Sequence, residues 1–127
     1  MTRVADTSAW IEYLIGSETG KRLSPAMPQG QDCIVPTIVQ LELAKWLSRE
    51  ASEAAMEKVI ADTMECVVAD LDTQTALLAA EMARSHKLAT ADAIIYATSR
   101  IRDAELLTCD VHFKDLPGVI YFPKARA

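Results

Sequence analysis

The sequence lacks any apolar segment long enough to cross a membrane as a helix. None of its apolar runs approaches the roughly 20 residues that such a helix requires. Near the N-terminus, Asp6 and Glu12 occupy positions where a signal peptide would be apolar. We therefore expect a cytoplasmic protein without a membrane partner.

Cysteine is scarce, and the cysteines do not occur in closely spaced pairs. Cys33, Cys66 and Cys109 are odd in number and widely spaced, and no CxxC motif is present. This pattern is typical of reduced thiols in a cytosolic protein. We place all three in strand-like segments of the chain.

Basic charge and several familiar catalytic motifs are also missing. The 13 lysines and arginines are outnumbered by 18 aspartates and glutamates, and the net charge of −5 argues against a broad basic surface for nucleic acid. His86 and His112 are the only histidines, and neither belongs to a Ser-His-Asp or Cys-His arrangement. Neither a Walker A motif nor a GxGxxG motif occurs. A nuclease that takes its positive charge from metal ions at the reaction centre is compatible with these absences.

What the chain does contain is an alternation of short apolar runs and helical segments. Its 127 residues, half of them apolar, suffice for one domain, which we expect to span residues 1–127. We expect strands at 3–5, 33–35, 66–69, 105–109 and 119–122. We expect helices at 8–16, 17–26, 37–49, 52–64, 73–87 and 91–102. The long crossovers between strands predict an α/β domain with a short, mostly parallel sheet of four to five strands, flanked by helices.

Capping residues precede most of these helices. The candidates are Thr7 or Ser8, Thr37, Ser52, Asp72 or Thr73, and Thr90. Gly16 is placed to end the first helix. Because Thr7 and Ser8 are both available, we expect that Asp6 is not needed as a cap.

Glu42 is out of place in its expected helix. The apolar face of that helix consists of Ile38, Val39, Leu43 and Trp46. Glu42 lies in the middle of this face, and burying a lone carboxylate costs several kcal/mol unless it is paired or bound to a metal. Two interpretations are open: an ion pair with Lys45 at the edge of the face, or a position in a functional cavity.

Other acids follow the strands. Ligands of an open parallel sheet bind beyond the carboxyl ends of its strands, and Asp6 and Asp110 come directly after the first and fourth strands. The Glu42 helix leaves the same edge. Asp92 lies in the first turn of a helix that follows another helix, so the sequence does not determine at which edge of the sheet it lies. Taken singly, Asp6 and Asp110 are also ordinary turn residues, and Asp92 also suits a helix dipole.

Gathering these acids at one edge requires a positive counter-charge. Two carboxylates about 5 Å apart repel each other by roughly 3 kcal/mol at an effective dielectric constant of 20. Ligand sets made only of oxygen suit Mg²⁺ or Mn²⁺ rather than zinc. The acids therefore point to a metal site if they converge.

Four segments together resemble the PIN-domain family, and within it the toxin ribonucleases of VapBC toxin–antitoxin systems. The segments are VADTSAWIEYL, PTIVQLELAKWL, LATADAIIYATS and LLTCDVHFKDLPGV, which span essentially the whole chain. The resemblance implies an Mg²⁺- or Mn²⁺-dependent endoribonuclease whose acidic site is Asp6, Glu42, Asp92 and Asp110. It also implies a cognate VapB-like antitoxin, an RNA substrate and a homodimer, with DNA contacted only indirectly through the antitoxin.

The resemblance suggests a role for each acid. Asp6, Asp92 and Asp110 would coordinate the metal directly, and Glu42 would bind through water or orient the attacking water. Many relatives have a further acid where this chain has His112, which leaves the occupancy of a second metal open. His112 is then a phosphate contact, a water contact or a surface residue without a role.

Neighbouring side chains extend this expected site. Thr7 and Thr108 are placed to hydrogen-bond the acids or a metal-bound water. At the rim, RNA would meet the basic residues Lys45, Arg49, Arg100 and Arg102, each of which is also compatible with a solvated surface position. No RNP-like aromatic motif occurs, so shape and a few phosphate contacts would select the substrate.

Two other classes of protein are alternatives to a nuclease. A receiver-type phosphoacceptor domain needs adjacent acids after the first strand, but here Asp6 is followed by Thr7 and Ser8. A non-catalytic PIN-like interaction protein would need no acids, and the intact set of four argues against it. Incubation with RNA in Mn²⁺ and in EDTA separates this class from a nuclease.

Overall fold

A fully parallel sheet of five strands forms the centre of the molecule. The computed structural model describes residues 1–125. The strands are β1 (Arg3–Ala5), β2 (Cys33–Pro36), β3 (Val67–Ala69), β4 (Glu105–Thr108) and β5 (Val119–Tyr121). Their order in the sheet is β3-β2-β1-β4-β5, and every neighbouring pair is parallel. The predicted α/β class with a mostly parallel sheet is confirmed.

Helices connect the strands close to the predicted positions. The α-helices are α1 (Thr7–Ile15), α2 (Glu18–Leu23), α3 (Thr37–Glu50), α4 (Glu53–Thr63), α5 (Thr73–His86) and α6 (Thr90–Ile101). Short 3-10 helices cover Ser24–Ala26, Gly30–Asp32 and Val111–Phe113. None of the helices within residues 1–125 has both the length and the apolar character that a bilayer span requires. Cys66 and Cys109 lie just outside β3 and β4, so only Cys33 is in a strand as expected.

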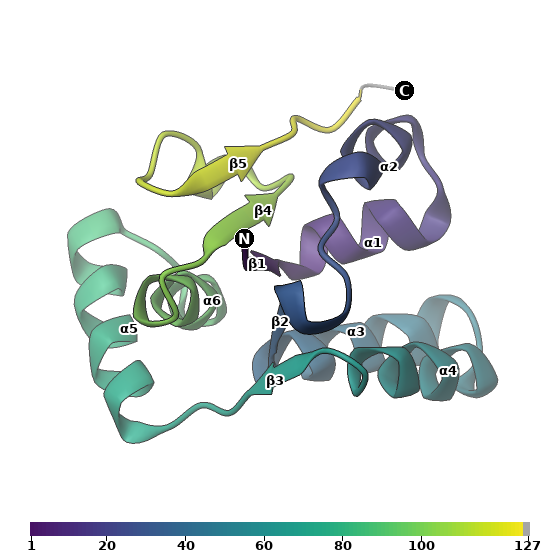
Figure 1. Cartoon of the computed structure of the whole chain (residues 1–127), viewed down its shortest axis with the longest axis horizontal. Coiled ribbons are helices and arrows are strands. Elements are labelled where there is room, and N and C mark those ends of the chain that lie inside the picture. Colours follow the sequence, from purple (N-terminus) through teal and green to yellow (C-terminus); the bar gives the residue numbers. More distant parts are fainter. Residues whose placement is uncertain (126–127) are drawn as a thin grey trace.

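The helices cover the sheet from two sides. Figure 1 shows α5 and α6 on one side of the strands, and α1 and α2 on the other. Helix α6 lies against β1 and β4 and carries α5 on its outer side, so it is buried nearly all round. Helix α3 contacts both α1 and α6 and thereby joins the two layers.

The caps differ in part from the prediction. Asp6 is the N-cap of α1, because it is extended and its side chain accepts the N–H of Ala9, whereas Thr7 is already helical. Helices α3 and α6 begin after Pro36 and Ala89 without a side-chain cap. The capping roles expected for Thr7 or Ser8, Thr37 and Thr90 are therefore wrong. Ser52 and Asp72 do cap α4 and α5, and Gly16 ends α1 with a φ of 66°.

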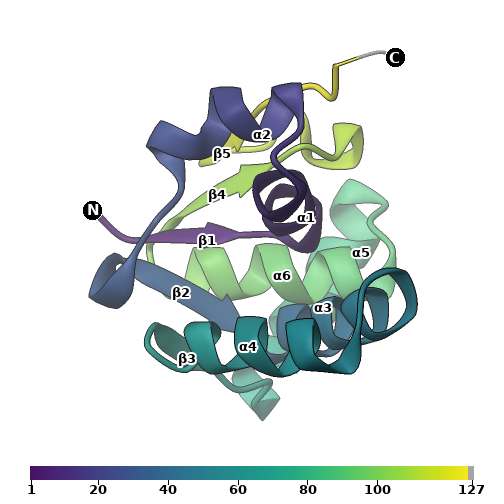
Figure 2. The ribbon, with the colours of Figure 1, turned by 90° about the vertical axis from the view of Figure 1, so that its right-hand side faces the viewer.

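The strand directions place the acidic residues. In Figure 2, the arrowheads of β1, β2 and β4 point toward the side where α1 and α3 lie. Asp6 follows β1, Asp110 follows β4, and Glu42 lies in α3, which follows β2. Because α6 leads into the start of β4 through only three residues, its last turn lies at the amino end of β4. Asp92, in the first turn of α6, is therefore directed to the carboxyl edge with the others.

Candidate active site

Asp6 is a buried carboxylate held by three hydrogen-bond donors. Its side chain lies at the junction of β1 and α1, and the residue is only 3% exposed. Oδ1 accepts the Ser8 hydroxyl at 2.7 Å and the Ala9 backbone N–H at 2.9 Å. Oδ2 accepts the Thr108 hydroxyl at 2.6 Å. These contacts fix the orientation of the carboxylate between α1 and β4.

Burial raises the pKa of Asp6 from 3.8 to about 6. The hydrogen bonds from Thr108, Ala9 and Ser8 act in the opposite direction, because they stabilise the charged form. The nearby charge of Asp110 raises the pKa a little further. Asp6 therefore loses its proton close to neutral pH, at an energetic cost that a cation would remove.

Glu42 is joined to α1 by a short hydrogen bond. The Thr7 hydroxyl donates to Oε1 of Glu42 at 2.5 Å, which links the first turn of α1 to the middle of α3. Among residues 1–125, Lys45 forms no ion pair with Glu42. The interpretation of Glu42 as the partner of Lys45 in an ion pair is therefore wrong. Thr7 has instead the hydrogen-bonding role that the sequence suggested.

Asp92, Asp110 and His112 bring possible ligand atoms together. One ligand atom from each of these residues lies within 4.8 Å of the others. Nδ1 of His112 is 3.0 Å from Oδ1 of Asp110, and the same oxygen accepts the His112 backbone N–H at 2.9 Å. The Asp110 backbone N–H donates to the Thr108 hydroxyl at 2.9 Å, which ties this group to Asp6. His112 belongs to the site by position, although its side chain is 71% exposed.

Asp92 experiences the other acids directly. Its pKa is raised, first by desolvation and then by the charges of Asp110 and Glu42, while His112 acts in the opposite direction. Asp110 has the same effect on Asp6. Asp110 therefore interacts with both Asp6 and Asp92, and Glu42 interacts with Asp92, so each of the four predicted acids lies near at least one other. Asp6 and Glu42 nevertheless lie outside the tight ligand cluster, and hydroxyl groups engage both of them.

Ser8 is a site residue that sequence reasoning considered only as a cap. Its hydroxyl donates to Asp6 and accepts the backbone N–H of Cys109 at 3.0 Å, so it connects α1 to the end of β4. The available signal was the Asp-Thr-Ser run directly after a strand. Such a run places two hydroxyls next to the acid, but their partners come from distant parts of the chain.

Arg100 and Arg102 are not at the rim of this site, so that expectation is wrong. Both are at the end of α6 opposite to Asp92. The Arg100 guanidinium donates to the Ala104 carbonyl at 2.7 Å and lies 5.4 Å from the centre of the Tyr96 ring. The two ends of a helix of this length are roughly 18 Å apart. Both arginines therefore lie far from the acids.

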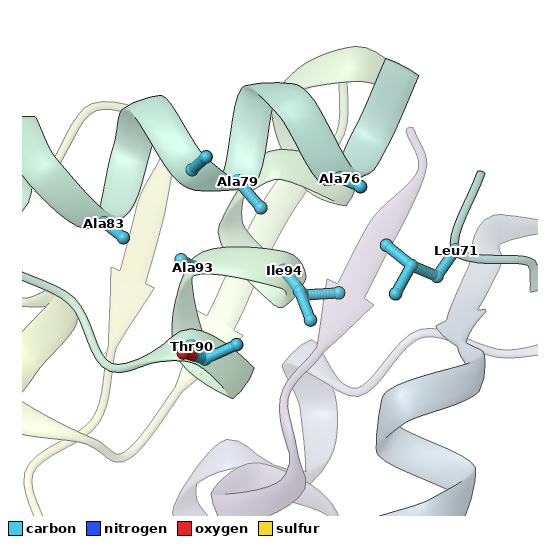
Figure 3. Close-up of a pocket in the computed structure, with 8 residues that line it drawn as sticks. Leu71, Ala76, Ala79, Ala83, Thr90, Ala93 and Ile94 are labelled. Carbon is cyan, nitrogen blue, oxygen red and sulfur yellow. The ribbon is translucent and has the colours of Figure 1, made fainter. Parts of the chain in front are cut away.

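An apolar hollow between α5 and α6 is separate from the acids. Figure 3 shows alanines of α5 facing Thr90, Ala93 and Ile94 of α6, with Leu71 at one end. The hollow has a volume of about 290 Å³, and none of the described residues that line it is a carboxylate. Its lining of alanines, Leu71, Ile94 and Thr90 is apolar apart from the Thr90 hydroxyl, whereas the carboxylates lie at the carboxyl edge of the sheet.

The fold and the acidic edge define an α/β domain with a carboxylate site at the end of a parallel sheet. The family model described as "PIN domain" matches residues 3–119, and the chain belongs to the PIN-domain family. No curated protein matches the sequence significantly.

Several solved structures share this fold. A toxin–antitoxin complex from Klebsiella pneumoniae has 22% identity and a TM-score of 0.79, over 94% of this chain and 96% of that one. DNA-bound VapBC from Salmonella typhimurium has 20% identity and a TM-score of 0.70, over 96% and 98%. VapC20 from Mycobacterium tuberculosis, described as a sarcin-ricin loop cleaving toxin, has 19% identity and a TM-score of 0.69, over 89% and 92%.

Proposed function

We propose that the protein is a metal-dependent endoribonuclease that acts in the cytoplasm as the toxin of a type II toxin–antitoxin system, with residues 1–127 as one catalytic unit. One observation carries the proposal: buried Asp6 and half-buried Asp92 lie near Asp110 and Glu42. Within residues 1–125, no lysine or arginine forms an ion pair with any of the four. Like charges in partly buried positions need a counter-charge, and PIN-domain membership supports a divalent cation.

The donor set fits Mg²⁺ or Mn²⁺. Asp92 and Asp110 present carboxylate oxygens close together, and Asp6 lies beside them. A bound divalent ion would acidify a water and neutralise charge on the phosphodiester in the transition state. Glu42, oriented by the Thr7 hydroxyl, would accept a proton from the attacking water. Ser8 and Thr108 would keep Asp6 in its orientation.

His112 affects which metal this site would prefer. Its Nδ1 lies next to Asp110, where a nitrogen ligand would favour a softer ion than Mg²⁺. We propose that Mn²⁺ supports activity at least as well as Mg²⁺. His112→Ala should reduce any advantage of Mn²⁺, measured as the ratio of cleavage rates in the two metals.

We propose a VapB-like antitoxin as the cognate partner, with any DNA contact made through it. The solved VapBC complexes that share the fold support this partner. We also propose a homodimer, because Leu71 and Leu77 are 46% and 68% exposed and Leu71 borders the apolar hollow of Figure 3. Light scattering would detect the dimer, and a monomer at micromolar concentration would contradict it.

The activity is tested with purified protein and bulk RNA. We expect cleavage with Mn²⁺ or Mg²⁺ and none with EDTA. Asp92→Asn should lower the rate by orders of magnitude, whereas the same substitution at exposed Asp70 should leave it unchanged. Equal cleavage by both variants, or cleavage that persists in EDTA, would remove the metal-site assignment.

A further inference from the structure

Two hollows flank the acidic edge, and each has site residues in its wall. The first, between α1 and α3, has a volume of about 220 Å³ and is lined by Thr7, Ile11, Glu42, Lys45, Trp46 and Arg49. We call it the α3 hollow. The second, beside the ends of β4 and β5, has a volume of about 500 Å³, and its lining includes Ser8, Asp110, Tyr121 and Lys124. We call it the β5 hollow.

The two hollows lie on opposite sides of Asp6. Strand β1 is central in the sheet, with β2 and then α3 on one side and β4 and β5 on the other. Thr7 donates to Glu42 and lines the α3 hollow, while its neighbour Ser8 donates to Asp6 and lines the β5 hollow. An extended ligand that occupied both hollows would therefore have to pass over the carboxylates.

Each hollow combines an aromatic ring with positive charge. Trp46 and Lys45 line the α3 hollow, and Tyr121 and Lys124 line the β5 hollow. Both rings are half-buried and both lysines are exposed. Within residues 1–125, neither lysine belongs to an ion pair. In a chain with a net charge of −5, unpaired cations beside an acidic site are available to an anionic ligand.

A second cation accompanies the lysine on each side. In the α3 hollow, the one ion pair of Arg49 among residues 1–125 is with its exposed neighbour Glu50, at 3.2 Å. At the β5 hollow, the Arg22 guanidinium donates to the Pro123 carbonyl at 3.3 Å, next to Lys124. Aromatic rings for bases and cations for phosphates are the features by which proteins hold single-stranded nucleic acid. A duplex would keep its bases stacked on each other and away from these rings.

We propose that the two hollows hold the nucleotides on either side of the scissile phosphate of a single-stranded RNA. One base stacks on Trp46 with its phosphates at Lys45 and Arg49, and the other stacks on Tyr121 with a phosphate at Lys124. This inference rests on the proposed nuclease function, since it places the cleaved bond over the four acids. It adds a path for the substrate and names the residues that hold it.

The charge part is tested by the salt dependence of RNA binding. A fluorescent single-stranded RNA is titrated into full-length Asp92→Asn protein with Mn²⁺, at several salt concentrations. Each phosphate contact on a single strand contributes about 0.7 to the slope of log K against log salt. Replacing Lys45 and Arg49 together by Ala should lower that slope by about 1.4. Replacing exposed Lys58 and Arg84 changes the net charge equally and should leave the slope unchanged.

The stacking part is tested by fluorescence and by substitution. Saturating RNA should quench the emission of Trp46 but not that of Trp10, which is only 7% exposed. Trp46→Leu, which keeps apolar volume without a π face, should weaken binding by about five- to 150-fold. Trp46→Phe should restore most of the affinity, and the quenching should be absent from both variants. Tyr121→Leu should weaken binding similarly.

The outcomes separate this inference from the nuclease proposal. RNA cleavage in Mn²⁺, combined with equal salt slopes for the hollow variant and its control, overturns the path and leaves the nuclease intact. Unquenched Trp46 emission with bound RNA also overturns it, as does equally tight, Trp46-dependent binding of duplex RNA. If substitutions in the two hollows weaken RNA binding as expected but no RNA is cleaved, the path is supported and the catalytic proposal is refuted. Absence of both cleavage and RNA binding overturns both.

Discussion

Replacing Asp6 by Asn should flatten the dependence of stability on pH. Asp6 is buried, and its pKa is raised from 3.8 to about 6 by desolvation. A group whose pKa is higher in the folded state stabilises the protein below its unfolded pKa, and this contribution is lost as pH rises through the folded value. Ionisation of Asp6 should therefore destabilise the metal-free protein between about pH 4 and pH 7.

The size of the effect follows from the two pKa values. Each pKa unit corresponds to 1.36 kcal/mol, so a rise from 3.8 to about 6 corresponds to about 3 kcal/mol over the full range. Between pH 5 and pH 7.5, the free energy of unfolding should fall by about 1.4 kcal/mol on account of Asp6. The raised pKa of Asp92 acts in the same direction.

Asn suits this position because it keeps the contacts without the charge. Asn caps a helix as well as Asp does, so its side-chain oxygen can accept the Ala9 N–H. The Thr108 hydroxyl, which donates to Oδ2 of Asp6, can turn to accept from the new amide. The variant should thus fold normally and carry no titrating group at this site.

Urea denaturation with EDTA, at several pH values from 5 to 7.5, measures the effect. The curve of the free energy of unfolding against pH should be flatter for Asp6→Asn than for the wild type by about 1.4 kcal/mol over this range. Asp70→Asn removes an exposed carboxylate and should leave the slope as in the wild type. Parallel curves for the wild type and Asp6→Asn would refute the desolvation of Asp6.

Three further predictions concern the acidic site and the helix packing around Gly20. Thr7→Val, which removes the donor to Glu42, should slow RNA cleavage about tenfold or more in initial-rate assays, since such a bond to a charged group is worth about 1.5–3 kcal/mol. Mn²⁺ at about 100 times its Kd should raise the free energy of unfolding by about 2.7 kcal/mol at neutral pH, and less in Asp92→Asn. Gly20→Ala should destabilise the protein by about 3 kcal/mol or more in urea, because a Cβ there would lie 1.9 Å from the Glu12 carbonyl oxygen.

The sequence predicts the strands and the acids that follow them for a physical reason. Buried parallel strands are short apolar runs, and the residue after such a run is placed at the carboxyl edge by the strand itself. Asp6 and Asp110 could be placed in this way, and Glu42 could be placed by the helix that leaves β2. These inferences need only the local pattern and the direction of the chain.

The edge at which Asp92 lies could also have been inferred from the sequence. Only three residues separate α6 from β4, so the end of the helix must lie near the start of that strand. The first turn, with Asp92, then points to the carboxyl edge. The same reasoning sends Arg100 and Arg102 to the opposite end, which corrects their expected place at the rim.

The choice of cap for α1 could not be decided locally. Asp6, Thr7 and Ser8 are all good capping residues, and propensity ranks them closely. Tertiary contacts decide between them: the Thr7 hydroxyl is engaged by Glu42, and Ser8 is engaged by Cys109 as well as by Asp6. Glu42 and Cys109 lie 35 and 101 residues away from these hydroxyls along the chain.

The cap and the charge of Asp6 can be separated on energetic grounds. If position 6 served only as a helix cap, Asn would do so as well as Asp. It would also avoid the cost of about 3 kcal/mol that ionisation of Asp6 imposes at neutral pH. Hydrogen bonds from Ser8, Ala9 and Thr108 offset only part of that cost, since the pKa is still raised. The pKa of Asp92 is raised as well, by desolvation and by the charges of Asp110 and Glu42. Carboxylates with raised pKa values at the carboxyl edge of a parallel sheet are typical of functional sites, and a cation would turn their repulsion into binding energy.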